Sequence, residues 1–337
     1  MLEESDRSLP RRGLLIALTL FSSVSAIGGG YELILWRAGD SFVPLSLLEY
    51  TPFATFLVPG ILLAAVVGGT SLVAAMLAIR RAPGTIDATI LAGGALTVWI
   101  VAELAMLRQI HWLHVLYGAL GLAILGLGVA GARALRQRWT VIVTAGEALG
   151  YMAPAMAGIL SVQAGLSEAA QAGLVVAGGF VEGLALGLAQ ARALPLAVDR
   201  RRYALLTSLA AGGVWAAVMS TRLLIDVDVP VALLVVAFIV VGVFGLGAIG
   251  GAQWLELRRH APRAWPWIGW TALAWVVGLP LSFAPGPFVD ESTPLFAHVG
   301  LWGSGGIMMA YVMSLITWRG VRALMSEETR IKEVARA

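Results

Sequence analysis

The sequence predicts an all-α, polytopic integral membrane protein with ten transmembrane helices in a 4 + 6 arrangement, on three observations. First, 59% of its 337 residues are hydrophobic, 13% are charged and the mean hydropathy is +0.85. Soluble domains are about 45–50% apolar and about 25% charged, so this composition excludes a soluble protein. Second, apolar runs of about 20 residues, the length that crosses a bilayer, recur with short breaks. Third, the basic residues gather in alternate breaks.

Apolar runs between charged clusters define the expected helices. Each run is long enough to cross a hydrocarbon core of ~30 Å. We expect spans at 13–36, 53–79, 86–107, 112–134, 140–163, 169–194, 203–225, 230–257, 265–283 and 296–318. Seven tryptophans lie near the ends of these spans, where interfacial anchoring is expected: Trp36, Trp112, Trp139, Trp254, Trp265, Trp267 and Trp318.

The distribution of basic residues sets the expected orientation. Twenty of the 23 lie in segments on one side, and only Arg37, Arg108 and Arg222 lie on the other. By the positive-inside rule both termini face the cytoplasm. The expected location is a bacterial cytoplasmic (inner) membrane. The twenty inner residues are Arg7, Arg11, Arg12, Arg80, Arg81, Arg133, Arg136, Arg138, Arg192, Arg200, Arg201, Arg202, Arg258, Arg259, Arg263, Arg319, Arg322, Arg330, Lys332 and Arg336.

The ten spans fall into two groups, with a possible repeat in the second. We expect a four-helix membrane unit over 1–138, a six-helix unit over 139–320 and a cytoplasmic tail over 321–337. The six-helix unit consists of three hairpins, at 140–194, 203–257 and 265–318. An offset of 63 residues places Gly187 on Gly250 and Gln190 on Gln253. Duplication of a hairpin explains this match, and so does chance in a composition so rich in small apolar residues.

Glycines and prolines mark expected features of individual helices. Pro59 and Pro154 each remove a backbone donor and are expected to kink their helices. Small residues spaced by four allow close approach of helices in a membrane. The expected pairs are Gly146/Gly150, Gly183/Gly187 and Gly247/Gly251.

Short motifs in each half resemble two groups of membrane proteins. The stretch Gly247 to Arg259, GAIGGAQWLELRR, followed by a tryptophan-rich span, resembles a glycine-rich Gln-Trp repeat of uncharacterised bacterial polytopic membrane proteins. The first half, with Gly-Gly-Gly before Glu32, Pro59-Gly60 and the stretch from Trp99 to Glu103, is similar to a small uncharacterised four-span family. Neither resemblance implies an activity.

Three glutamates inside the expected spans are the main site candidates: Glu182, Glu147 and Glu103. An ionisable group at membrane depth costs several kcal/mol unless it is neutral, paired or hydrated. Glu147 and Glu182 lie in one hairpin and can form a protonatable pair for transport or ligand binding. Alternatively, the two glutamates have only a structural role. Each neutral carboxyl group then forms a hydrogen bond with a backbone carbonyl or with Tyr151, Gln163, Gln171 or Gln190. Gln190 and Gln253 are further candidates for ligand contact, or for hydrogen bonds between helices.

Neither a cofactor nor a metal is assigned. Cysteine is absent, which excludes disulfides and thiolate metal sites. His111, His114 and His298 are all expected near the outer surface, where a metal or haem site and ordinary hydrogen bonding both remain open. Arg222 is expected to pair with Asp226.

Two functions are compatible with this sequence. The first is membrane-embedded binding or transport of a small apolar or amphipathic compound, coupled to protons through the glutamates. The alternative is a non-catalytic subunit or scaffold of a membrane protein complex. No catalytic motif favours an enzyme and no catalytic residue is assigned. The expected partners are membrane lipids and, for a scaffold, other integral membrane proteins; no nucleic acid is expected.

Overall fold

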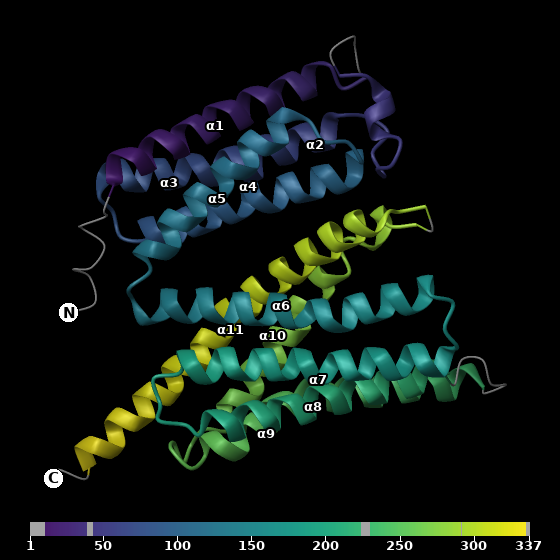
Figure 1. Cartoon of the computed structure of the whole chain (residues 1–337). Coiled ribbons are helices and arrows are strands. Elements are labelled where there is room, and N and C mark those ends of the chain that lie inside the picture. The colour runs from purple at the N-terminus through teal and green to yellow at the C-terminus, as the bar shows by residue number, and fades with distance from the viewer. Residues whose placement is uncertain (1–10, 39–42, 224–229, 291, 335–337) are drawn as a thin grey trace. The chain divides into compact units, whose positions relative to one another are not determined.

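The computed structural model describes residues 11–38, 43–223, 230–290 and 292–334 (Figure 1). Within these ranges all regular structure is helical and there is no strand. The α-helices are α1 Arg12–Leu35, α2 Leu57–Leu62, α3 Gly69–Arg80, α4 Thr85–Leu107, α5 Trp112–Gly131, α6 Leu135–Gln163, α7 Glu168–Ala193, α8 Arg200–Leu223, α9 Val231–Leu257, α10 Pro266–Ser282 and α11 Leu295–Val334. A π-helix, Leu63–Gly68, joins α2 to α3, and two short 3₁₀ helices cover Leu45–Leu48 and Gly286–Phe288.

The helices identify the chain as a polytopic membrane protein. In the described part of the chain, nine helical segments are long and apolar enough to cross a membrane, counting 57–80 as one. The sequence predicts ten spans, and α6 is the one outside this set. Its apolar run is interrupted by Glu147, Tyr151 and Pro154, which lower its mean hydropathy.

The chain divides into two compact units. The first contains residues 1–138 and 285–304, and the second contains 139–284 and 305–337. The segment 285–304 therefore belongs with the first unit, whereas the sequence analysis assigned it to the six-helix unit. Its Gly300 lies against Val101 of α4, and Ala297 and Leu301 share a small core with Ala105. This segment ends within α11, so the division between the units falls inside that helix.

The first unit packs α1 against the helical segment 57–80. A methyl group added at Gly30 would lie 2.6 Å from the carbonyl oxygen of Gly60, so the two backbones touch. Ser22 and Ser71 share a hydrogen bond of 3.0 Å across the same contact. Pro59 lies in the first turn of α2, where a helix needs no backbone donor. The proline therefore starts this helix, and the irregularity that follows it is the π-helix at 63–68.

In the second unit, glycines of α7 allow the neighbouring helices to approach closely. A methyl group at Gly183 would lie 2.7 Å from the carbonyl oxygen of Thr207 on α8. One at Gly178 would lie 2.6 Å from the backbone nitrogen of Pro154 on α6. Figure 1 shows α7 and α8 side by side along their lengths. Such contacts supply the packing that holds helices together in lipid.

The expected glycine pair of α9 is wrong. A methyl group added at Gly247 or Gly251 would meet no heavy atom of another described helix within 4 Å, whereas one at Gly250 would lie 3.0 Å from the Cα of Ile268 on α10. The glycine that approaches α10 is therefore the one that the 63-residue offset places on Gly187.

Aromatic residues form the core at the end of the second unit where α8 and α10 begin. Trp139, Tyr203 and Trp267 are almost fully buried, at 0%, 0% and 1% exposure. The rings of Trp139 and Trp267 meet edge to face, with their centres 6.0 Å apart. These two tryptophans are core residues, so the prediction of interfacial anchoring is wrong for them. Trp36, Trp112 and Trp265 are exposed, as an interfacial residue would be.

Candidate functional site

Glu147 and Glu182 lie in the middle of α6 and α7, in the interior of the second unit. Their exposed fractions are 1% and 3%. A methyl group at Gly150 would lie 3.0 Å from the carbonyl oxygen of Glu182, so α6 and α7 meet at this level. Glu147 is one helical turn before Gly150 and therefore shares its face of α6. The structure thus brings the two glutamates to one helix contact.

The partner of Glu182 comes from the next helix. The indole Nε1 of Trp215 on α8 donates a hydrogen bond of 2.7 Å to Oε2 of Glu182. The Trp215 ring also covers Gly179, one turn away on α7, and leaves no room there for a side chain. Tyr151, Gln163, Gln171 and Gln190, the partners considered from the sequence, do not make this bond.

The carboxyl group of Glu147 makes no hydrogen bond with the described residues. Both of its carboxyl oxygens are buried, and neither has a hydrogen-bond partner among the described residues. Tyr151 lies one turn further along α6, where its side chain is hydrogen-bonded to Ser282. Burying a carboxylate without a partner costs far more than burying a neutral polar group. The neutral acid is therefore the form of Glu147 that this environment favours.

Gln190 and Gln253 bind each other rather than lining an open site. The Nε2 of Gln253 donates to Oε1 of Gln190 at 2.7 Å and to Oγ1 of Thr207 at 3.2 Å. The Tyr203 hydroxyl donates to the same Gln190 oxygen at 3.1 Å, and Trp267 Nε1 donates to Oε1 of Gln253 at 2.8 Å. Both glutamines are buried. This network connects four helices, α7 to α10, which is the structural role weighed in the sequence analysis.

Glu103 belongs to the first unit and forms a separate polar group. It accepts a hydrogen bond from Trp99, one turn before it on α4, and its carboxylate lies 3.8 Å from Nε2 of His114. Its side chain is 35% exposed. Glu103 therefore lacks the enclosure found around Glu147 and Glu182.

Two of the histidines form the start of α5. Nδ1 of His114 accepts from the backbone N–H of His111 at 3.0 Å, and Nδ1 of His111 accepts from that of Leu113 at 3.4 Å. This is a helix-capping arrangement. Nδ1 of His298 is buried without a hydrogen-bond partner among the described residues. The described chain holds no group of three or more His, Cys, Asp or Glu side chains arranged for a metal ion.

Glu256 is a buried acid that the sequence analysis missed. It is 1% exposed, and its carboxylate lies 3.3 Å from Arg202 and 3.2 Å from His260. Its Oε1 also accepts from the backbone N–H of Asp199 at 3.2 Å. The available signal was the spacing to Arg259 and His260, three and four residues later, which places both on the same face of the chain. The expected pair Arg222–Asp226 includes a residue outside the described ranges.

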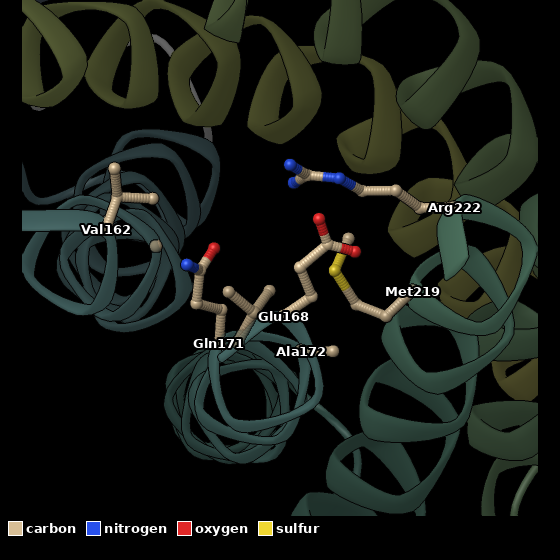
Figure 2. A pocket seen from close by; sticks show the side chains of 8 residues that line it. Val162, Glu168, Gln171, Ala172, Met219 and Arg222 are labelled. Carbon is tan, nitrogen blue, oxygen red and sulfur yellow. The ribbon is translucent and has the colours of Figure 1, made fainter. Parts of the chain in front are cut away.

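A cavity of about 150 Å³ opens between α6, α7 and α8 (Figure 2). Figure 2 shows the charged groups of Glu168 and Arg222 and the amide of Gln171 facing the same space. Val175, which lines the cavity, lies two turns from Glu182 on α7, which is a rise of about 10 Å. Met219 lies one turn from Trp215 on α8. The cavity and the buried glutamates therefore lie along the same helices.

Comparisons with protein-family models, curated proteins and solved structures found no match to this chain. The resemblances of the two halves to other membrane proteins remain predictions.

Proposed function

We propose that the second unit binds and transports a small apolar or amphipathic compound, coupled to the binding and release of a proton at Glu147 and Glu182. The observation that carries this proposal is that both carboxyl oxygens of Glu147 are buried with no hydrogen-bond partner in the described part of the chain, beside a second buried acid. A purely structural carboxyl would be expected to have a partner, as Glu182 has in Trp215.

Coulombic repulsion is the physical basis of the proposed coupling. Two carboxylates in a medium of low dielectric constant repel each other strongly, so the pair keeps at least one proton. A compound that binds close by with a donor or a positive charge would favour the ionised form and release that proton. Proton binding would in turn favour release of the compound, because linkage is reciprocal.

The topology belongs to the same proposal. We place ten spans in the cytoplasmic membrane of a bacterium, with α6 as the tenth and both termini in the cytoplasm. The division of basic residues supports this orientation. Proton coupling supplies a reason for α6 to carry an acid despite its cost. We also retain the proposed duplication of hairpins 140–194 and 203–257, supported by the equivalent positions of Gln190 and Gln253.

The alternative function, a scaffold or non-catalytic subunit, is favoured by α9. Only 6% of the apolar stretch of this helix is buried within the chain. Val235, Phe238 and Val243 are among its exposed residues. Lipid covers such a surface in a single protein, and an apolar helix of another membrane protein covers it in a complex.

Proton movement in proteoliposomes tests the transport proposal. Vesicles containing the full chain and a trapped pH-sensitive dye are exposed to indole, tetraphenylphosphonium or L-valine, which are respectively apolar, cationic and zwitterionic. We expect at least one compound to move protons with the wild-type protein and to fail with Glu147→Gln. Glu49→Gln, which changes an exposed acid in the first unit, is the control. The proposal is overturned if none of the three compounds moves protons with the wild-type protein, or if Glu147→Gln moves as many protons as the wild type.

A further inference from the structure

Opposite charges face the cavity between α6, α7 and α8. Glu168, in the first turn of α7, supplies a carboxylate, and Arg222, near the end of α8, supplies a guanidinium. Figure 2 shows both groups directed into the same space. No ion pair within 4.0 Å joins these two described side chains. Each charge can therefore be reached by a separate group of one ligand.

Gln171 adds an oriented acceptor to the acidic side of the cavity. Its Nε2 donates to the carbonyl oxygen of Leu166 at 2.8 Å, which fixes the direction of the amide. Its Oε1 can then accept a hydrogen bond from a ligand. Glu168 and Gln171 are three residues apart on α7, so they share a face and can both contact one ammonium group.

The remaining lining is apolar and small. Val162, Val175 and Met219 are the larger apolar side chains, and Gly158 and Ala172 complete the wall. A cavity of about 150 Å³ is known to accept a ligand as large as benzene, so a compound with a short branched hydrocarbon group fits this volume.

We propose that this cavity binds a small aliphatic zwitterion of the amino-acid type. Its ammonium group contacts Glu168 and Gln171, its carboxylate contacts Arg222, and its hydrocarbon group lies against Val175 and Met219. A planar guanidinium suits a carboxylate because it can donate two parallel hydrogen bonds. This inference rests on the proposed function and deepens it, since it names the class of compound that the second unit takes.

Equilibrium binding of radiolabelled L-valine to the purified full chain in detergent tests the proposal without any requirement for transport. Unlabelled L-valine, isobutylamine and isobutyrate serve as competitors. The amine lacks the carboxylate of valine, and isobutyrate lacks its ammonium group. We expect L-valine to bind saturably. Isobutylamine and isobutyrate should each compete with an affinity at least about tenfold lower than that of unlabelled L-valine, because each lacks one charge-assisted hydrogen bond.

Two variants assign the charges to their residues. Arg222→Gln should weaken L-valine binding about tenfold or more without weakening competition by isobutylamine. Glu168→Gln should weaken L-valine binding similarly without weakening competition by isobutyrate. Arg192→Gln, an exposed substitution at the other end of α7, and Glu49→Gln are matched controls that should bind L-valine like the wild type.

The outcomes separate this proposal from the proposed function. Absence of saturable L-valine binding to the wild type, or binding that neither cavity variant weakens, overturns the zwitterion site. L-valine binding without proton movement in proteoliposomes would contradict the coupling while supporting the site. Proton movement driven only by indole or tetraphenylphosphonium would support the coupling and contradict the site.

Discussion

Gln253 donates a hydrogen bond of 2.7 Å to Oε1 of Gln190, a residue 63 positions earlier in the chain. The same offset of 63 residues is the one for which the sequence predicts a repeat. Each glutamine also receives a hydrogen bond from an aromatic residue that follows it, Tyr203 for Gln190 and Trp267 for Gln253. The two glutamines thus meet in one buried network that connects α7, α8, α9 and α10.

Removal of the Gln253 amide should destabilise the second unit. Gln253→Leu would leave Trp267 Nε1 buried without its acceptor, at a cost of about 1–3 kcal/mol. It would also remove one of the donors to Gln190, which keeps its hydrogen bond from Tyr203. Thermal unfolding in detergent should show a lower midpoint for this variant. Gln163→Leu changes an exposed glutamine at the end of α6 and should leave the midpoint nearly unchanged. Equal midpoints for the Gln253 and Gln163 variants would show that the network does not stabilise the protein.

The bond between Trp215 and Glu182 gives a graded series of variants. Glu182→Gln retains an oxygen that can accept from the indole, so it should fold with nearly wild-type stability. Glu182→Leu removes that acceptor and should lower the free energy of unfolding by about 1–3 kcal/mol. Trp215→Phe should also destabilise, since it removes the donor and part of the packing. Thermal unfolding midpoints, measured in one detergent, give the order of stability of these variants. A Glu182→Leu variant as stable as Glu182→Gln would contradict the prediction.

Gly183 should tolerate no side chain. A methyl group there would lie 2.6 Å from Cβ of Ala211 and 2.7 Å from the carbonyl oxygen of Thr207, so α7 and α8 must separate to accept Gly183→Ala. We expect a loss of about 1–3 kcal/mol, as for overpacked cores. Gly173→Ala on the same helix meets no heavy atom within 4 Å from the other described parts of the chain, and it should be neutral or slightly stabilising because alanine favours helix. Similar unfolding midpoints for the two variants would rule out the close contact.

Asp290 should make the stability of the first unit depend on acidity. Hydrogen bonds from the Ser292 and Thr293 hydroxyls, with the nearby charge of Arg108, hold the pKa of Asp290 below its usual 3.8. A lowered pKa in the folded state contributes stability above pH 3.8, and that contribution disappears as the pH falls through the folded-state pKa. The stability difference between wild type and Asp290→Asn should therefore be constant near neutral pH and shrink below pH 3.8. A difference that persists unchanged in acid would contradict this assignment.

The helices could be predicted from the sequence because hydropathy is a local property. The expected span 112–134 corresponds to α5, Trp112–Gly131, and the span 169–194 to α7, Glu168–Ala193. The contacts between helices could not be predicted in this way. Glu182 and Trp215 are 33 residues apart, and the rotation of α8 that brings them together depends on the packing of Gly183 and Thr207.

Hydropathy also could not predict which charged residues next to the ends of the spans are buried. Glu256 lies among Arg258, Arg259 and His260, so its position resembles a solvated loop. Its burial depends on the backbone of Asp199, in the loop before α8, and on Arg202, in the first turn of α8. Likewise, the choice of Gly250 rather than Gly247 and Gly251 as the contact glycine depends on where α10 approaches α9.

The most direct test of the central claim, that Glu147 holds a proton in the interior of the second unit, is labelling with dicyclohexylcarbodiimide. This apolar reagent reacts with protonated carboxyl groups, and mass spectrometry of the purified protein identifies the residue modified. We predict an adduct on Glu147 at neutral pH that disappears as the pH is raised and is absent from Glu147→Gln. Glu49, an exposed acid of the first unit, is the control residue and should stay unlabelled. No adduct on Glu147 at any pH, with the protein still folded, would contradict the claim.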